Sequence, residues 1–346
     1  MFETVGLGVI FFVVLILPFR VRIVEQNLGI FLFVMGAMAV TVTSSWKWHL
    51  VEEALVTPLP ITGAVLVAGS IVYILHHRLQ AVVRWVSDRI SLRPLLFFVV
   101  VVLGFVSSII SAIIAALFLV TVLELLPLDR RCRVNVTIIA CFAIGIGAVL
   151  TPLGEPLSTI AISKLEGEPH NAGFFFLLDL LGSFVVPGVL AMGLLTLTPL
   201  VRISPSEEAG SEERERGSYW EVLVWVLKVF IFVMALVLLG ESFRVLIDKY
   251  FIKLAPEILY WINTVSAVLD NATLAAAEVG PSLSITQIKA VLISLMVSGG
   301  MLIPGNIPNI IAADRLNIGM REWASLAIPL GAVMLAVCFV VLFYVI

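Results

Sequence analysis

Hydrophobic positions fall into long, nearly continuous runs along the chain, separated by short polar segments. A transmembrane helix needs about 20 mostly apolar residues. Runs of this kind predict about eight full spans, near residues 3–19, 28–45, 57–75, 135–163, 174–200, 220–240, 285–313 and 323–346. The first run has no basic residues before it and no small-residue cleavage site, so we interpret it as a transmembrane helix, not a signal peptide.

Two further apolar stretches, 94–126 and 255–281, do not fit a simple crossing. The first is long for one span and short for two, so we predict a re-entrant hairpin made of two half-length helices. Carrying the topology forward predicts a second hairpin at 255–281. The tip of the first hairpin is expected near Ser107, Ser108 and Ser111, where hydroxyl residues interrupt the apolar run. Irregular backbone at that depth is tolerated only where it is buried in protein or faces a watery cavity.

The positions of Lys and Arg predict the orientation, because basic residues accumulate in cytoplasmic loops. Placing Arg20, Arg22 and the 130–133 cluster inside puts both termini outside, with one hairpin entering from each side. Residues 76–93 and the segment from Arg244 to Lys253 are predicted to be amphipathic surface helices. Residues 201–219, rich in Glu, Ser and Gly, are predicted to be a flexible cytoplasmic linker.

The two halves of the chain resemble each other in sequence. Ser111-Ala112-Ile113-Ile114 matches Ser266-Ala267-Val268-Leu269, and each is followed by a Glu-x-x-Pro, beginning at Glu124 and Glu278. Because the two hairpins enter from opposite sides, the repeat is expected to be inverted, as in many secondary transporters. The expected organisation is N-terminal helices at 1–56, a first repeat at 57–200, the linker, and a second repeat at 220–346.

A Pro-x3-Pro pattern lies inside one predicted span of each half. Proline removes a backbone donor and clashes with the preceding turn, so a pair with glycine nearby should unwind the helix. The sequence therefore predicts two broken transmembrane helices, 135–163 and 285–313, although simple proline kinks remain the alternative. The expected breaks are formed by Pro152, Gly154 and Pro156 and by Pro304, Gly305 and Pro308.

Composition supports a membrane protein and excludes several classes of function. Of 346 residues, 61% are hydrophobic and 13% are charged, against about 25% charged in soluble domains. Lipid is therefore the expected environment. No basic run indicates nucleic-acid binding. Cys132, Cys141 and Cys338 lack disulfide or zinc spacing and are interpreted as packing residues.

Acidic residues within predicted membrane segments are candidates for function, because burying an ionisable group there is costly. Asp270 lies at the expected tip of the second hairpin, and Glu155 lies in the first broken helix. We expect both to converge on a small cation, with Na⁺ the candidate ion and no other cofactor. Burial disfavours a charged carboxylate, so such a group could exchange a proton for a cation. The remaining predicted ligands are Asn271, Ser266, Thr273, Thr151 and Asn306.

Other acids have simpler interpretations. Glu124 and Glu278 precede prolines near hairpin ends and are expected to be interfacial. Asp179 is a candidate structural partner for Lys228. Asp270 and Glu155 themselves could serve only as structural residues, Asp270 by capping a half-helix.

The layout resembles the ion transporter superfamily, and within it a family of small prokaryotic predicted cation transporters similar to NhaD-type sodium/proton antiporters. The resemblance covers about residues 57–346. It rests on 266–271, on Gly147 to Pro156, and on Ser298-Gly299-Gly300 leading into Ile303-Pro304-Gly305-Asn306. It implies a homodimer in the prokaryotic inner membrane and an elevator-type motion. The Ser-Asn-Thr signature of dicarboxylate carriers is absent from the first hairpin tip, where Ser107 and Ser108 stand.

Three functions remain open. The leading hypothesis is a cation/proton antiporter, exchanging Na⁺ for H⁺ by alternating access around Asp270. The second is a sodium-coupled symporter of a small anion or organic acid. The third, an intramembrane aspartyl protease using Asp179 and Asp270, lacks the expected glycine-flanked aspartates, so we predict that the protein is not an enzyme.

Overall fold

A computed structural model describes residues 2–87, 89–202, 219–250, 254–269 and 271–345. Within these ranges every regular element is a helix and no strand occurs. The N-terminal part contains α1 (Phe2–Arg20), α2 (Arg22–Gln26), α3 (Leu28–Val42), α4 (Trp48–Val56) and α5 (Pro58–Ser87). The predicted spans at 3–19 and 28–45 correspond to α1 and α3.

The rest of the chain alternates long helices with short ones. It comprises α6 (Leu92–Ile110), α7 (Ala112–Leu125), α8 (Arg130–Ala148), α9 (Pro156–Leu165), α10 (Phe176–Leu195), α11 (Tyr219–Tyr250), α12 (Pro256–Ile262), α13 (Asn271–Glu278), α14 (Ile285–Ser298), α15 (Ile307–Arg315) and α16 (Met320–Val340). Short 3-10 helices, η2 (Asn263–Ala267) and η3 (Ile303–Gly305), precede α13 and α15, and a π-helical turn, η4 (Val341–Val345), follows α16.

Seven helices in the described part of the chain are long and apolar enough to cross a membrane. They include Leu92–Ile110, which the sequence assigned to one arm of a hairpin, whereas α3 and α14 are shorter apolar helices. On α1 the exposed side chains are themselves apolar and recur along one face, at Val5, Val9, Phe12 and Ile16. Apolar faces on membrane-length helices indicate a multi-pass protein embedded in lipid.

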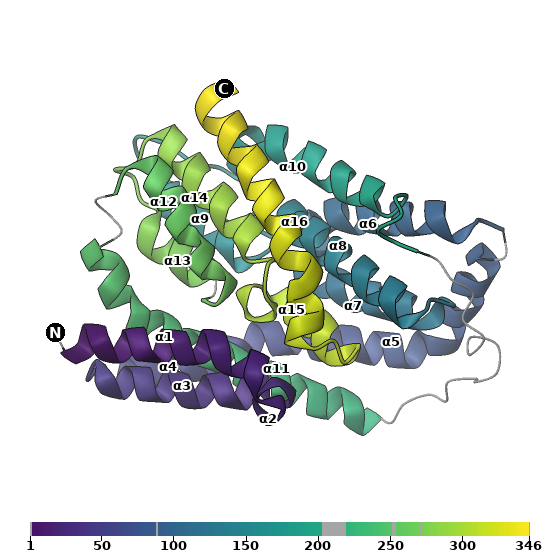
Figure 1. The fold of residues 1–346 in the computed structure, drawn as a ribbon, viewed down its shortest axis with the longest axis horizontal. Coiled ribbons are helices and arrows are strands. Elements are labelled where there is room, and N and C mark those ends of the chain that lie inside the picture. Colours follow the sequence, from purple (N-terminus) through teal and green to yellow (C-terminus); the bar gives the residue numbers. More distant parts are fainter. Residues whose placement is uncertain (1, 88, 203–218, 251–253, 270, 346) are drawn as a thin grey trace.

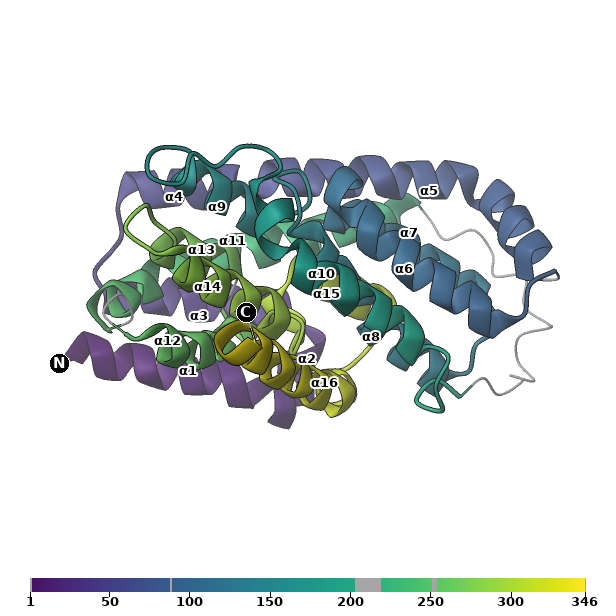
Figure 2. The ribbon, with the colours of Figure 1, turned by 90° about the horizontal axis from the view of Figure 1, so that it is seen from above.

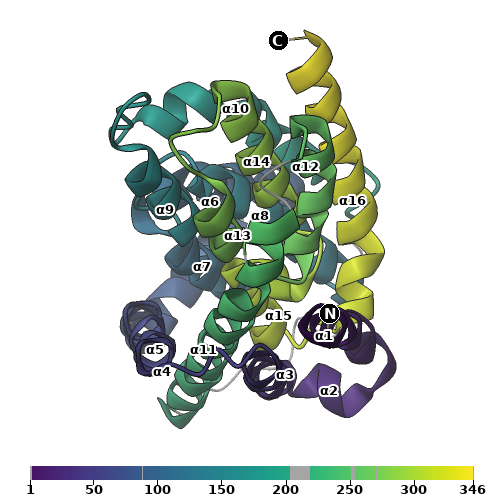
Figure 3. The same ribbon diagram turned by 90° about the vertical axis from the view of Figure 1, so that its left-hand side faces the viewer.

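The helices form two groups. Seen along its longest axis, the molecule has α5, α11, α3 and α1 in a row along one side (Figure 3), and α3 and α5 both pack against α11. In the other group α12, α13 and α14 lie towards one end of the longest axis and α6 and α7 towards the other (Figure 1). From above, α6, α8 and α10 run alongside one another (Figure 2), and each packs against the other two.

The core lies around α8 and α14. On α8 every residue from Val136 to Ala148 is buried, and on α14 every residue from Ala290 to Ser298 is buried. Both helices end where the Pro-x3-Pro segments begin, so the interruptions predicted from the sequence stand in the interior of the molecule. The predicted breaks are thereby placed among packed helices.

Two predictions about surface helices were wrong. Residues 76–93 do not form a separate helix, because α5 continues from Pro58 to Ser87 without interruption. Likewise α11 continues through Arg244 to Tyr250, while Lys253 lies outside the described residues. Each helix extends beyond its apolar part, because the polar residues that follow include no proline or glycine that would end it. The connection between α3 and α5 contains the helix α4.

Candidate functional site

The first interruption separates α8 from α9. Helix α8 ends at Ala148, and α9 begins at Pro156, where a missing backbone N–H costs nothing in the first helical turn. Gly154 folds back so closely that a Cβ there would overlap the carbonyl oxygen of Ala148. Pro152 and Pro156 therefore flank a real break in the helix, and the simple kink is excluded.

The turn between α6 and α7 is fastened to this break. A single residue, Ser111, joins the two helices, with φ 76° and ψ 149°, a conformation that glycine adopts far more readily. The backbone N–H of Ala112 donates to the carbonyl of Gly154 at 2.8 Å. The Thr151 hydroxyl donates to the carbonyl of Ser108. The turn falls where the sequence predicted a hairpin tip.

The serines near this turn are bonded to backbone. The buried Ser107 hydroxyl lies 2.7 Å from the Gly104 carbonyl and 3.0 Å from the Ile144 carbonyl, so it ties α6 to α8. The Ser108 hydroxyl donates to Phe105. These hydroxyls hold helices together at the first break.

The second interruption separates α14 from α15. The chain leaves α14 at Ser298, passes through η3, which contains Pro304, and re-enters a helix at Ile307-Pro308. The amide nitrogen of the fully buried Asn309 donates to the carbonyls of Gly299, at 2.9 Å, and Leu302, at 3.0 Å. Its side chain supplies donors to carbonyls at the end of the broken helix.

Carbonyl oxygens from two segments converge at Gly305. A Cβ at Gly305 would lie 2.6 Å from the carbonyl oxygen of Gly299, 2.8 Å from that of Ser266 and 3.0 Å from that of Ala267. The Ser266 and Ser298 hydroxyl oxygens are 2.5 Å apart, and both residues are buried. Helix η2 thus packs on the second break, as the turn at Ser111 packs on the first.

The other predicted ligands are placed around these two breaks. Asn271 is buried, and its amide nitrogen would lie 3.3 Å from a Cβ at Gly299. Asn306 lies against α8, where a Cβ at Gly145 would lie 2.8 Å from its amide nitrogen. Glu155 is 6% exposed at the start of α9. Thr273, on α13, packs against Gly240 of α11. Asp270 lies outside the described residues.

Packing between the two halves of the chain is reciprocal. Helix α7, from the first helix pair, contacts α15, which follows the second break. Helix α13, which follows η2, contacts α9, which follows the first break. The helix after the turn in one half therefore packs against the helix after the break in the other half. These pairs are α7 with α15 and α13 with α9.

Sequence reasoning missed a buried polar cluster beside the second break. Asn263 is fully buried, and its amide nitrogen donates to Glu278 Oε2 at 2.9 Å and to Ser294 Oγ at 3.1 Å. The Ser298 hydroxyl donates to the Asn263 carbonyl at 3.0 Å. Glu278 is 7% exposed, so it is enclosed by protein, and its interfacial position stays a prediction. The available signal was the spacing of Ser294 and Ser298, which places two hydroxyls on one face of an apolar helix.

Ion pairs surround the C-terminal end of α15. Lys228 pairs with Asp314 at 2.9 Å, not with the exposed Asp179 proposed from the sequence. Arg315 lies 3.3 Å from Glu124. These pairs connect α15 to α11 and α7.

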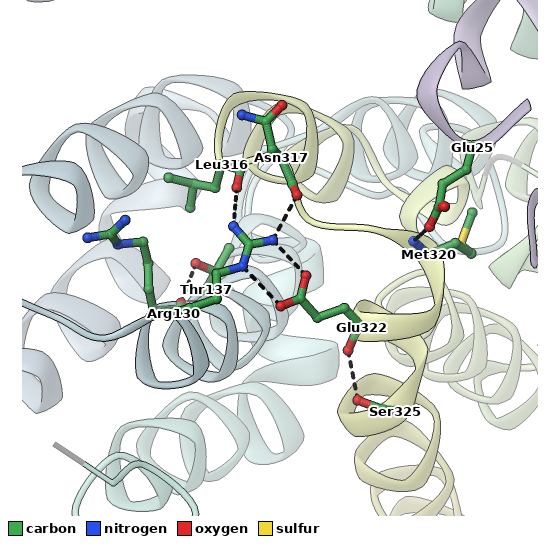
Figure 4. A network of polar contacts seen from close by, with 9 residues as sticks. Glu25, Arg130, Thr137, Leu316, Asn317, Met320, Glu322 and Ser325 are labelled. Atoms are coloured by element: carbon green, nitrogen blue, oxygen red, sulfur yellow. Dashed lines mark hydrogen bonds and ion pairs between the residues drawn. The ribbon is translucent and has the colours of Figure 1, made fainter. Parts of the chain in front are cut away.

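Arg130 makes four hydrogen bonds near the end of α15 (Figure 4). Its guanidinium contacts both carboxylate oxygens of Glu322, at 2.7 and 3.0 Å, and donates to the carbonyls of Leu316 and Asn317 at 2.7 Å each. It therefore joins α8 to α16 while satisfying carbonyls at the end of α15.

Within the described residues there is no group of three or more His, Cys, Asp or Glu side chains that could hold a metal ion. The oxygens gathered at the breaks are carbonyl, hydroxyl, amide and single carboxyl groups, which suit a hard cation. A comparison with curated proteins finds no match for the chain. A family model described as "Protein of unknown function (DUF1646)" matches residues 4–345, and the chain therefore belongs to the DUF1646 family.

Proposed function

We propose that the protein is a secondary active transporter, a cation/proton antiporter that exchanges Na⁺ for H⁺ by alternating access. The observation that carries the proposal is the pair of interior helix interruptions, each bonded to or packed against the turn of a neighbouring helix pair. Interrupted helices of this kind expose carbonyls and half-helix ends to ions in known transporters.

The reciprocal packing supports an inverted repeat with two re-entrant hairpins. In this proposal α6 and α7 form the first hairpin, and α12, η2 and α13 form the second. The contacts of α7 with α15 and of α13 with α9 are those expected when two similar halves interlock. The sequence repeat and the resemblance to NhaD-type antiporters support the same assignment.

The proposed cation site lies at the second break. The carbonyls of Ser266, Ala267 and Gly299 supply oxygen ligands near Gly305, and small hard cations prefer such ligands. We assign the carboxylate ligand to Asp270, which lies outside the described residues. Na⁺ and H⁺ would then compete for one carboxyl group, which couples their movements. Glu155 and Thr151 would serve the corresponding position at the first break.

Orientation and assembly follow from the same proposal. The end of α15 that carries Arg315, and the linker of 201–219, would face the cytoplasm of a prokaryotic cell, with both termini outside. A homodimer in the inner membrane is the assembly that the superfamily resemblance implies. Neither nucleic acid nor an enzymatic substrate is part of this proposal.

Reconstitution into liposomes with an imposed Na⁺ gradient tests the function. The wild-type protein should move protons against Na⁺, and Asp270→Asn should abolish this exchange. Asp179→Asn, the same change at an exposed position on α10, is the matched control and should leave exchange intact. Exchange that survives Asp270→Asn would refute the assignment of Asp270. Sodium-dependent uptake of an organic acid without proton movement would replace antiport with symport.

A further inference from the structure

The carboxyl of Glu278 is buried without a cationic partner among the described residues. Its Oε2 accepts a hydrogen bond from the neutral Asn263 amide, and its Oε1 has no hydrogen-bond partner there. The equivalent acid in the first half, Glu124, instead pairs with Arg315. A buried carboxylate held by only a neutral donor is costly, and binding a proton removes that cost.

Among the described residues, no charged group on the helices packed against α13 neutralises Glu278. These helices carry Lys164 on α9, Lys289 on α14, and Glu221, Lys228, Glu241, Arg244, Asp248 and Lys249 on α11. Lys228 pairs with Asp314. Glu241 and Arg244 pair with each other at 3.7 Å, and Lys164 is exposed. Lys289 makes no ion pair with Glu278 in the part of the chain that the structure describes. The side chains of Glu221 and of residues 245–250 on α11 lie outside that part.

Asn263 provides a second buried acceptor in the same place. Its Oδ1 also has no partner among the described residues, although the side chain is fully buried. The pair therefore holds two oxygens, Glu278 Oε1 and Asn263 Oδ1, that accept nothing, while the Asn263 nitrogen donates twice. The arrangement lacks a donor, and one proton on the carboxyl supplies it.

We propose that Glu278 is a proton-binding site, separate from the cation site. In the ionised state Glu278 Oε2 accepts from the Asn263 nitrogen, and Oε1 has no partner among the described residues. A proton from water binds to Oε1, and the carboxylate becomes a carboxylic acid. Oε2 keeps its hydrogen bond from Asn263, so the buried amide stays satisfied in both states.

The site is connected to the second break through serine hydroxyls. The Asn263 carbonyl accepts from Ser298, and Ser298 is hydrogen-bonded to Ser266, whose own carbonyl faces Gly305. The residue that binds Glu278 through its side chain is therefore joined through its backbone carbonyl to the oxygens that surround the proposed cation site. The role of Glu278 as a carrier of the exchanged proton rests on the proposed antiport, whereas its protonation does not.

Infrared difference spectroscopy on the full-length protein in lipid membranes, recorded between high and low pH, tests the protonation directly. The wild type should show the carbonyl stretch of a protonated buried carboxyl at low pH, and Glu278→Gln should lose that band. Glu257→Gln, at an exposed position on the adjoining α12, is the matched control and should keep it. Glu278→Asp, which retains a carboxyl if the glutamine variant does not fold, should keep the band at a shifted frequency.

A band that is unchanged in both Glu278 variants would overturn the inference. The same spectra do not depend on transport, so the outcomes separate the two proposals. A band that is lost in Glu278→Gln from a protein that exchanges no Na⁺ would support the proton site and refute the antiport. Na⁺/H⁺ exchange by a protein whose band does not change in either Glu278 variant would support the antiport and refute the proton site.

Discussion

The backbone N–H of Ala112 donates a 2.8 Å hydrogen bond to the carbonyl of Gly154, and so joins the turn between α6 and α7 to the interruption between α8 and α9. The two residues are distant in the sequence. Ala112 is the first residue of α7, so its N–H has no partner within that helix, and Gly154 lies in the interruption. The interruption therefore supplies an acceptor for the start of α7, as the interior of a membrane protein requires. We expect hydrogen bonds of this kind to stabilise the conformation of the chain at the first break.

Replacing Thr151 by Val should destabilise the protein by about 1–2 kcal/mol, because the change removes a buried hydroxyl bond to the Ser108 carbonyl across two segments. Thr137→Val is the matched control. Thr137 is also buried, but its hydroxyl bonds only to Arg133 in its own helix, whose carbonyl keeps a helical partner. Thermal unfolding in detergent measures both. Equal losses for the two variants would show that the contact across segments is unimportant.

Ser111 adopts a backbone conformation that favours glycine, so Ser111→Gly should be more stable than Ser111→Ala by about 1–3 kcal/mol. Both variants remove the hydroxyl, and only glycine relieves the backbone at φ 76°. Comparing the two unfolding midpoints isolates the strain. An alanine variant as stable as the glycine variant would contradict the strained turn.

Gly305→Ala should disrupt the second break. The added Cβ would press against the carbonyls of Gly299 and Ser266, and overpacking of this kind costs about 1–3 kcal/mol. Gly63→Ala, in α5 where nothing lies within 4 Å of the added carbon, should instead stabilise the helix by about 0.5–1 kcal/mol. Opposite signs in thermal unfolding are the expected result. Loss of stability at both positions would contradict the tight approach at Gly305.

Arg130→Lys should weaken the end of α15, because a lysine cannot contact two carboxylate oxygens and two carbonyls at once (Figure 4). The expected loss is about 1–3 kcal/mol. Lys228→Met breaks one exposed pair with Asp314 and should cost no more than about 1 kcal/mol. Unfolding by denaturant measures both variants. If Arg130→Lys is as stable as the wild type, the multiple contacts of the Arg130 guanidinium contribute little to stability.

The sequence located the helix breaks well, because proline acts locally. Pro156 and Pro308 stand in the first turns of α9 and α15, where their effect on the preceding backbone is direct. Ser111 likewise fell at the turn that the interrupted apolar run predicted. Such features depend on a few neighbouring residues.

Contacts between distant residues were not predictable in the same way. Glu278 and Glu124 stand in similar Glu-x-x-Pro segments, yet one is buried beside Asn263 and the other pairs with Arg315. Lys228 has Asp314 as its partner, where the sequence suggested Asp179. Only the packing of α13 on α14 and of α11 near α15 decides these environments. A single sequence carries no record of that packing.

Calorimetric titration of Na⁺ into the purified protein at a series of pH values tests the central claim most directly. Antiport through a shared carboxyl predicts that Na⁺ binds more weakly as the pH falls and that protons are released on binding. Asp270→Asn should remove both effects. Sodium binding that is independent of pH and releases no protons would contradict the account.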